Sequence, residues 1–163
     1  MSNGGWRPEC KHGVLGGTFS LLHAGHRHLL RYAWSLSGRL TVGVTTDEFA
    51  AMLGKSHPVE PYEVRALEVL LFLLSLGNKP VHVVPLNDPY GPAVDEKEID
   101  CIFVSEETFK GAYDINLLRR VRGYSPLRIY AVEMKNIGSK KISSTLLWAR
   151  LRGARRYSGR DHA

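Results

Sequence analysis

Length, composition and charge limit what this chain can be. Its 163 residues, of which 44% are hydrophobic and 23% are charged, fit one globular domain with a usable core. The formal net charge of +6 suits a partner that carries phosphate, either a nucleic acid or a small polyanion. The sequence has no RNP-like aromatic motif, zinc finger or KH-type motif, so a nucleic-acid-binding module rests on charge alone.

The sequence does not support a membrane protein or a metal-binding protein. No apolar run is long enough to span a bilayer, and the longest one, Val69 to Leu76, is predicted to be a buried helix segment. The N-terminus does not resemble a signal peptide. Cys10 and Cys101 lack the spacing of metal ligands, and two cysteines do not make a disulfide framework in a chain of this length. We therefore expect a cytoplasmic protein with reduced thiols and no metal site of its own.

Strands and helices are predicted to alternate along a single domain, residues 1–163, between a loose N-terminus (1–10) and a basic tail (153–163). The predicted strands are 12–16, 39–45, 81–86, 102–104 and 127–134. The predicted helices are 27–37, a short one capped at 46 or 47, 62–76, 106–122 and a last one that begins at 143. Alternation of this kind predicts an α/β fold with a parallel, doubly wound sheet.

The segment GGTFSLLHAGH, residues 16–26, follows the first predicted strand. Gly16 and Gly17 allow a ligand to approach the main chain, and a helix N-terminus attracts phosphate. His23 and His26 lie three residues apart, so they share one face of the helix and add N–H donors. This set suits phosphoryl or nucleotidyl transfer. The alternatives are a glycine-rich turn with surface histidines, or a metal site that adds His28 but lacks an i, i+4 histidine pair.

A second candidate phosphate site lies near the C-terminus, where Ile142 precedes three hydroxyl residues at the start of the last predicted helix. A helix N-cap explains one serine, but it does not explain Ser143, Ser144 and Thr145 together. Consecutive hydroxyls and unpaired main-chain N–H groups form a good cradle for a triphosphate.

Both segments resemble signatures of the HxGH nucleotidylyltransferase superfamily, which are GGTFDxxHxGH and ISSTxxR. The segments PLNDPYGPA (85–93) and VSEET (104–108), followed by GA (111–112) and IN (115–116), resemble phosphopantetheine adenylyltransferases of the archaeal and eukaryotic type. The RGLR segment of the bacterial type is absent. The resemblance implies a Rossmann-like, five-stranded parallel sheet in the order 3-2-1-4-5.

The resemblance also implies a reaction, in which ATP and 4'-phosphopantetheine give dephospho-coenzyme A and pyrophosphate. Mg²⁺ would be held mainly by the ATP phosphates. His26 would donate to the α-phosphate, Thr18 would orient the attacking phosphate, and Lys55 would bind the phosphate of phosphopantetheine, with Arg65 as an alternative. The ATP-binding residues implied are Gly16, Gly17, Thr18, Phe19, His23, His26, Glu107, Asn116, Arg119, Ile142, Ser143, Ser144 and Thr145. The pantetheine arm would meet Thr18, Lys55, Asn87, Asp88 and Tyr90.

The sequence departs from the family pattern at three positions. Ser20 stands where the family usually has aspartate, and Leu146 and Trp148 occupy positions near the end of the second signature where arginines are expected. Two other interpretations therefore stay open: transfer to another phosphate monoester such as FMN or nicotinamide mononucleotide, and a catalytically weakened nucleotide- or coenzyme A-binding protein. The implied partners are small molecules, with neither nucleic acid nor membrane, and the chain would be a monomer or a small homo-oligomer.

Overall fold

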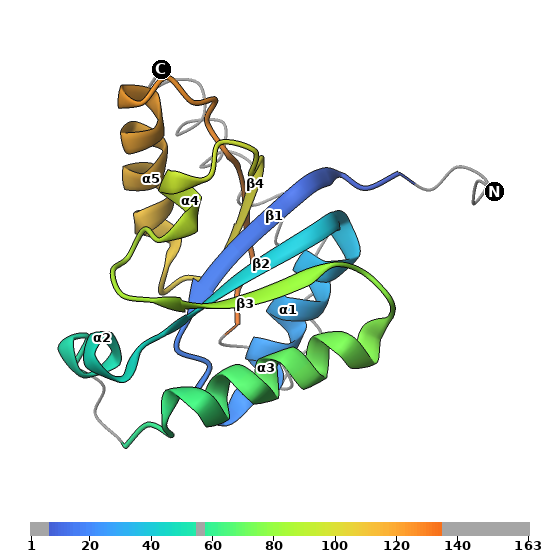
Figure 1. Cartoon of the computed structure of the whole chain (residues 1–163), viewed down its shortest axis with the longest axis vertical. Helices are drawn as coiled ribbons and strands as arrows, with labels where there is room; N and C mark the ends of the chain where they lie inside the picture. The colour runs from blue at the N-terminus through green and yellow to red at the C-terminus, as the bar shows by residue number, and fades with distance from the viewer. Residues whose placement is uncertain (1–6, 55–57, 135–163) are drawn as a thin grey trace.

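The computed structural model describes residues 7–54 and 58–134, which form a parallel α/β sheet with helices on both faces (Figure 1). The strands are β1 (Cys10–Gly17), β2 (Ser37–Thr45), β3 (Val81–Leu86), β4 (Cys101–Val104) and β5 (Arg128–Ala131). The helices are a 3₁₀ turn η1 (Ser20–Leu22), α1 (Ala24–Leu36), α2 (Asp47–Met52), α3 (Tyr62–Leu76), α4 (Pro92–Asp95) and α5 (Phe109–Val121). The sheet order is β3-β2-β1-β4-β5, and every pairing is parallel, so the predicted fold class and strand order are confirmed.

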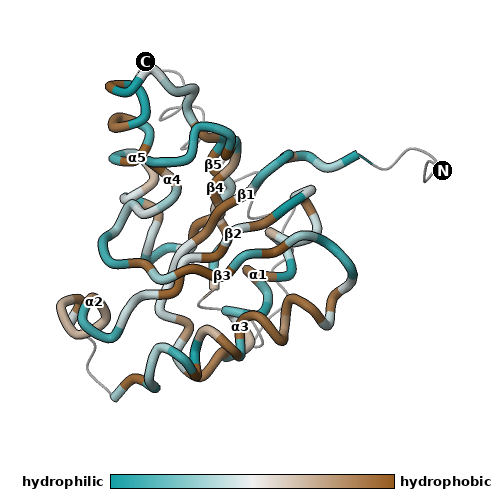
Figure 2. Tube along the Cα trace, viewed as in Figure 1, coloured by the Kyte–Doolittle hydropathy of each residue, from teal (hydrophilic) through white to brown (hydrophobic). Residues whose placement is uncertain are grey.

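The two faces of the sheet are covered by different helices. In Figure 1, α1 and α3 lie on one face and α4 and α5 on the other. Each face has its own hydrophobic cluster, and successive residues of β1 contribute to opposite clusters: Leu15 packs with α1 and α3, whereas Val14 packs with α4 and α5. This follows from the two-residue period of a strand. Figure 2 shows brown, hydrophobic stretches in the strands, which alternate with paler and teal residues.

The predicted bounds agree with the structure at α3 and β3, whereas those of β1, β2, α1, β4, α5 and β5 differ by one to three residues at one or both ends. Helix α1 begins at Ala24, three residues earlier than predicted, because His23 caps it. Helix α4 was not predicted; it is a four-residue turn with proline at its start. The run 69–76 is only half buried, since Val69 and Leu73 are fully buried whereas Leu71 and Leu74 are 56% and 54% exposed. A helix on the surface of a sheet turns only one face inward.

The expectation of reduced thiols is wrong, because Cys10 and Cys101 form a disulfide. They are 91 residues apart in the sequence, but parallel pairing of β1 with β4 brings their Cα atoms to 5.9 Å. Both side chains are fully buried at the amino ends of their strands. Separately, none of the helices in the described part of the chain is long and apolar enough to cross a membrane.

Candidate active site

Two cavities adjoin one another at the carboxyl end of the sheet, and they share Gly16, Gly17, Thr18, Glu107 and Thr108. The first, of about 160 Å³, is lined by the turn after β1, the two histidines of α1 and the loop after β4. The second, of about 490 Å³, is mostly apolar and extends between β2, β3 and α5. They meet where β1 lies between β2 and β4, which is the point where strand order reverses in a doubly wound sheet. Ligands bind at this position in open α/β sheets.

The turn between β1 and α1 has an unusual main-chain conformation. Phe19, Leu21 and Leu22 have φ angles of 56°, 62° and 40°, in the left-handed region that residues with a side chain rarely occupy. Each such residue costs on the order of 1–3 kcal/mol and persists only where its surroundings hold it. Gly17 also belongs here, since a Cβ at this position would lie 3.0 Å from the ring of Phe19. The chain therefore keeps a strained turn at the edge of the smaller cavity.

Glu60 holds this turn from a distant part of the sequence. Its Oε1 accepts a 2.8 Å hydrogen bond from the Ser20 hydroxyl, and its Oε2 accepts one of 2.8 Å from the main-chain N–H of Leu21. Burial acts to raise the pKa of Glu60, but the hydrogen bonds from main-chain N–H groups and from Ser20, with Arg65 nearby, lower that pKa below 4.5. Ser20 thus binds a carboxylate that comes from the segment before α3.

Arg65 lies behind the same turn, so it is no alternative to Lys55 as a phosphate ligand. Its side chain is fully buried. Its Nε donates to the Glu60 carbonyl at 2.6 Å, and its Nη2 donates to Asp47 Oδ1 at 2.9 Å. Its Nη1 donates to the Thr18 carbonyl at 3.0 Å and to Thr45 Oγ1 at 3.1 Å. Arg65 therefore joins the ends of β1 and β2 to the start of α3.

His23 and His26 cap the start of α1 reciprocally. His23 Nδ1 accepts from the N–H groups of Gly25 and His26 at 3.1 and 3.4 Å, and His26 Nδ1 accepts from the N–H of His23 at 3.3 Å. In the neutral rings this assigns the proton to Nε2 of each imidazole. The rings stack with their centroids 3.6 Å apart, and the His26 ring meets the edge of Phe19 at 5.4 Å.

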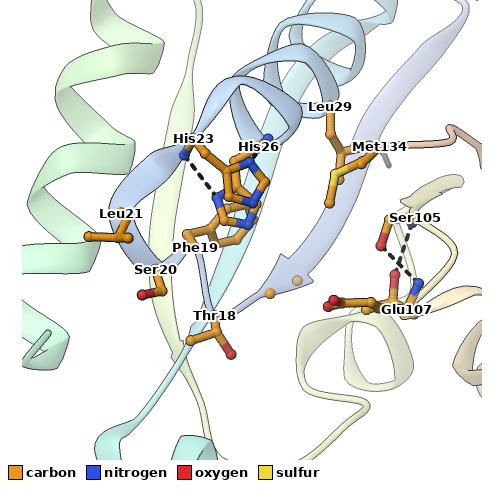
Figure 3. A pocket seen from close by; sticks show the side chains of 13 residues that line it. Thr18, Phe19, Ser20, Leu21, His23, His26, Leu29, Ser105, Glu107 and Met134 are labelled. Atoms are coloured by element: carbon orange, nitrogen blue, oxygen red, sulfur yellow. Dashed lines mark hydrogen bonds between the residues drawn. The ribbon is translucent and has the colours of Figure 1, made fainter. Parts of the chain in front are cut away.

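Figure 3 shows the stacked histidine rings above Phe19, with Thr18 at the end of β1 and Glu107 on the opposite side of the cavity. Gly25 allows this packing, because a Cβ there would lie 3.1 Å from both His23 Cε1 and Met134 Cβ. The turn after β1, the start of α1 and the loop after β4 therefore place a hydroxyl, two imidazoles and a carboxylate around one small cavity.

Comparison with known proteins identifies the family. A cytidylyltransferase-like family model matches residues 14–150. The chain is 45% identical over 142 residues to the phosphopantetheine adenylyltransferase of Methanopyrus kandleri, covering 86% of this chain and 87% of that protein. The corresponding enzyme of Thermococcus gammatolerans is 39% identical over 139 residues, covering 85% and 87%. The chain belongs to the phosphopantetheine adenylyltransferase family.

Two solved structures share the fold of this chain. The crystal structure of a protein with unknown function from Archaeoglobus fulgidus matches with a TM-score of 0.70 and 34% identity, covering 80% of this chain and 95% of that one. A lipopolysaccharide core biosynthesis protein from Thermoplasma volcanium matches with a TM-score of 0.54 and 21% identity, covering 77% and 97%, which shows a shared fold. The resemblance to phosphopantetheine adenylyltransferases, predicted from the segments 85–93, 104–108, 111–112 and 115–116, is confirmed.

Two residues that were predicted to bind the nucleotide, Asn116 and Arg119, have other roles in the structure. Asn116 donates from Nδ2 to the Leu127 carbonyl at 3.1 Å and accepts from the Leu127 N–H at 2.7 Å, so it braces the start of β5. Arg119 is 1% exposed. Its five N–H groups donate to main-chain carbonyls at 2.8–3.1 Å, those of Ser125, Ala93, Glu96, Lys97 and Ile99. With all five donors used, Arg119 has none left for a nucleotide, so its predicted role is wrong. Asn116 lines neither of the two cavities.

The loop after β3 contributes one of its three predicted residues to the cavities. Tyr90 lines the larger cavity. Asp88 instead holds the turn, since its Oδ1 accepts from the N–H groups of Tyr90 and Gly91, both at 2.9 Å. Asn87 and Asp88 are exposed, and neither is among the residues that line the two cavities. The Asn-Asp-Pro sequence therefore shapes the turn that presents Tyr90.

The other predicted site residues divide into two groups. Those that line the smaller cavity are Gly16, Gly17, Thr18, Phe19, His23, His26 and Glu107. Those outside the described residues are Lys55, Ile142, Ser143, Ser144 and Thr145, together with the departures at Leu146 and Trp148.

Sequence reasoning missed Glu60 and Thr45. Both act through contacts between distant segments, since Glu60 lies 40 residues from Ser20 and Thr45 lies 27 residues from Thr18. Thr45 carried one weak signal, its place as the last residue of a buried strand. In the described part of the chain, three potential metal-binding side chains meet at Cys10, Asp100 and Cys101, at the other end of the sheet. Both of those sulfur atoms belong to the disulfide.

Proposed function

We propose that the protein transfers the adenylyl group of ATP to 4'-phosphopantetheine, forming dephospho-coenzyme A and releasing pyrophosphate. The observation that carries this proposal is the pair of cavities that meet at Gly16, Gly17 and Thr18. The smaller cavity offers imidazole and hydroxyl donors at a helix start, which suits the phosphates of ATP. The larger, apolar cavity suits the pantetheine arm, and the acceptor phosphate would reach the α-phosphate at their boundary.

In the proposed reaction an oxygen of the acceptor phosphate forms a bond to the α-phosphorus as the bond to the β-phosphate oxygen breaks. No covalent enzyme intermediate is needed, so the protein acts by positioning and by charge stabilisation. His26 and His23 would donate from Nε2 to oxygens on which negative charge develops. Thr18 would orient the attacking phosphate through its hydroxyl.

The donor set also fits Mg²⁺ that enters with the nucleotide. Glu107 lines both cavities and offers carboxylate oxygens, whereas the remaining polar groups named above are donors suited to phosphate. Mg²⁺ would be held mainly by phosphate oxygens and water, and Glu107 would be a carboxylate available to it from the lining of both cavities. When bound, Mg²⁺ supplies positive charge at the leaving pyrophosphate.

The remaining assignments are proposals of the same kind. Lys55 would bind the phosphate of phosphopantetheine, and Ile142, Ser143, Ser144 and Thr145 would bind the triphosphate. The partners would be the two small-molecule substrates, and the reaction would take place in the cytoplasm, where ATP is available. The larger cavity would distinguish phosphopantetheine from acceptors with a planar ring, such as FMN and nicotinamide mononucleotide.

The test is pyrophosphate release with ATP, Mg²⁺ and each of these three acceptors, in the wild type and in His26→Ala. We expect release with 4'-phosphopantetheine, reduced on the order of 10²–10³-fold in His26→Ala, because one transition-state donor is removed. His28→Ala is the matched control, since His28 lies on the same helix but does not line the smaller cavity. A folded wild type that binds ATP but releases no pyrophosphate with 4'-phosphopantetheine would contradict the proposal.

A further inference from the structure

A chain of three polar side chains leads from the interior to the boundary of the two cavities. Arg65 Nη1 donates to Thr45 Oγ1 at 3.1 Å, and the Thr45 hydroxyl donates to Thr18 Oγ1 at 3.1 Å. All three residues are buried, with exposed fractions of 0%, 2% and 9%. Thr18, the last member, lines both cavities.

The hydrogen bonds between these three side chains all point from Arg65 toward the cavities. A guanidinium carries donors and no acceptor, so Arg65 cannot receive the proton of Thr45. The Thr45 hydroxyl accepts from Arg65, and in the structure it gives its one proton to Thr18. Thr18 Oγ1 is in turn an acceptor toward Thr45, and its own proton is left for a different acceptor. A phosphate oxygen at the boundary of the cavities is such an acceptor.

Thr18 is also held through its main chain. The second proton on Arg65 Nη1 binds the Thr18 carbonyl at 3.0 Å, and Asp47 balances the charge of the buried guanidinium at 2.9 Å. Asp47 begins α2, which Thr46 caps through the N–H of Phe49 at 3.1 Å. The residues that follow Thr45 are thus held by an ion pair at Asp47 and by the helix cap at Thr46.

We propose that Thr45 is a positioning residue, which together with Arg65 turns the Thr18 hydroxyl so that it donates its proton to the acceptor phosphate. The proposal rests on the proposed adenylyl transfer. Thr45 acts through Thr18, so its loss affects the turnover step and has little effect on ATP binding.

Thr41 offers a matched control on the same strand. It is buried like Thr45, with exposed fractions of 3% and 2%, and its hydroxyl is also hydrogen-bonded, to His12 Nε2 at 2.8 Å. Thr41 lies at the middle of β2, four residues before Thr45, and lines neither cavity. Replacement by valine keeps the shape of either side chain and removes its hydroxyl.

The first experiment measures kcat and KM for pyrophosphate release in Thr45→Val, Thr45→Ser and Thr41→Val. We expect Thr45→Val to lower kcat about tenfold, less than the loss of a direct donor, with the KM for ATP changed less than twofold. Thr45→Ser retains the hydroxyl and should retain most of kcat. Thr41→Val should keep the wild-type kcat even where its melting temperature falls. Wild-type kcat in Thr45→Val would overturn the proposal.

A double variant separates positioning from direct contact, because Thr45 also borders the larger cavity. If Thr45 acts through Thr18, then Thr18→Val/Thr45→Val has the same kcat as Thr18→Val alone. Multiplicative losses in the double variant would show that Thr45 acts independently and would overturn the proposal. If Thr45→Val fails to fold, Thr45→Ala takes its place in both comparisons.

A measurement without turnover distinguishes failure of this proposal from failure of the proposed function. Methyl NMR of protein labelled with ¹³C-threonine reports the side-chain rotamer of Thr18. We expect a single rotamer in the wild type and in Thr41→Val, and rotamer averaging in Thr45→Val. An unchanged Thr18 methyl signal in Thr45→Val would overturn the positioning role, whether or not the wild type acts on 4'-phosphopantetheine.

Discussion

Within residues 7–54 and 58–134, one buried arginine lies at each end of the sheet, and the two arginines have different partners. Arg65, at the carboxyl end, binds the hydroxyl of Thr45, the carboxylate of Asp47 and two carbonyls of the turn and loop at the site. Arg119, beside the start of β4, binds five main-chain carbonyls. The first arginine orders groups that face a ligand, whereas the second closes a loop around a core.

The difference shows how a buried arginine in a phosphate-binding protein should be interpreted. Charge and burial are the same at both positions, but the partners decide the role. Burial lowers the pKa of Arg119, and Tyr124 and Asp100 partly offset that effect. The amino end of the sheet, where Arg119 lies, also contains the Cys10–Cys101 disulfide, so both features there stabilise the fold. The site end instead contains a strained turn, which its surroundings must hold in place.

Arg119→Lys should have the largest effect on stability. An ammonium has three donors, so it leaves buried carbonyls without a hydrogen bond, at a cost of about 3 kcal/mol in the free energy of unfolding. At roughly 2–4 °C per kcal/mol, the melting temperature should fall by about 6–12 °C. The measurement is thermal unfolding, with Arg120→Lys on the exposed side of the same helix as control. Wild-type kcat at 25 °C is expected, and a large loss of kcat would restore a role for Arg119 at the site.

Arg65→Lys should reverse this pattern. One ammonium cannot reach Thr18, Thr45 and Asp47 together, so the turn and the Thr18 hydroxyl lose their common support. We expect kcat for pyrophosphate release to fall about 100-fold, which corresponds to about 2.7 kcal/mol of transition-state stabilisation. Arg119→Lys, assayed at the same temperature, is the matched control. Equal kcat values in the two variants would show that the contrast between the two ends of the sheet is wrong.

The two arginines also show how far sequence reasoning reaches. Periodicity predicted α3 and β3 to the residue, because an apolar run ended by Gly77 and a β-branched run are local signals. The HAGH segment predicted the histidines, because a helix start and its capping residues are adjacent in sequence. Nothing local showed that Arg119 and Arg65 are buried residues with structural partners and not phosphate ligands, since their partners lie up to 47 residues away. The contacts of Glu60 and the disulfide were hidden for the same reason.

Glu60→Gln tests the site end at its smallest expected effect. The glutamine keeps the shape but loses the charge that accepts from Ser20 and Leu21, which should cost about 1 kcal/mol in the free energy of unfolding and a few-fold in kcat. The folded-state pKa of Glu60 is lowered from 4.5, so its stabilisation is present in full above pH 4.5 and is lost as the pH falls through the folded-state pKa.

The urea midpoints of wild type and Glu60→Gln should therefore differ at pH 7 and converge below pH 4.5. Glu63→Gln, an exposed carboxylate in the first turn of α3, should follow the wild type throughout. A difference that persists unchanged into acid would assign the effect to packing and not to the carboxylate. The strained turn would then be held by Arg65 and by the packing of the Glu60 side chain, without help from the charge of Glu60.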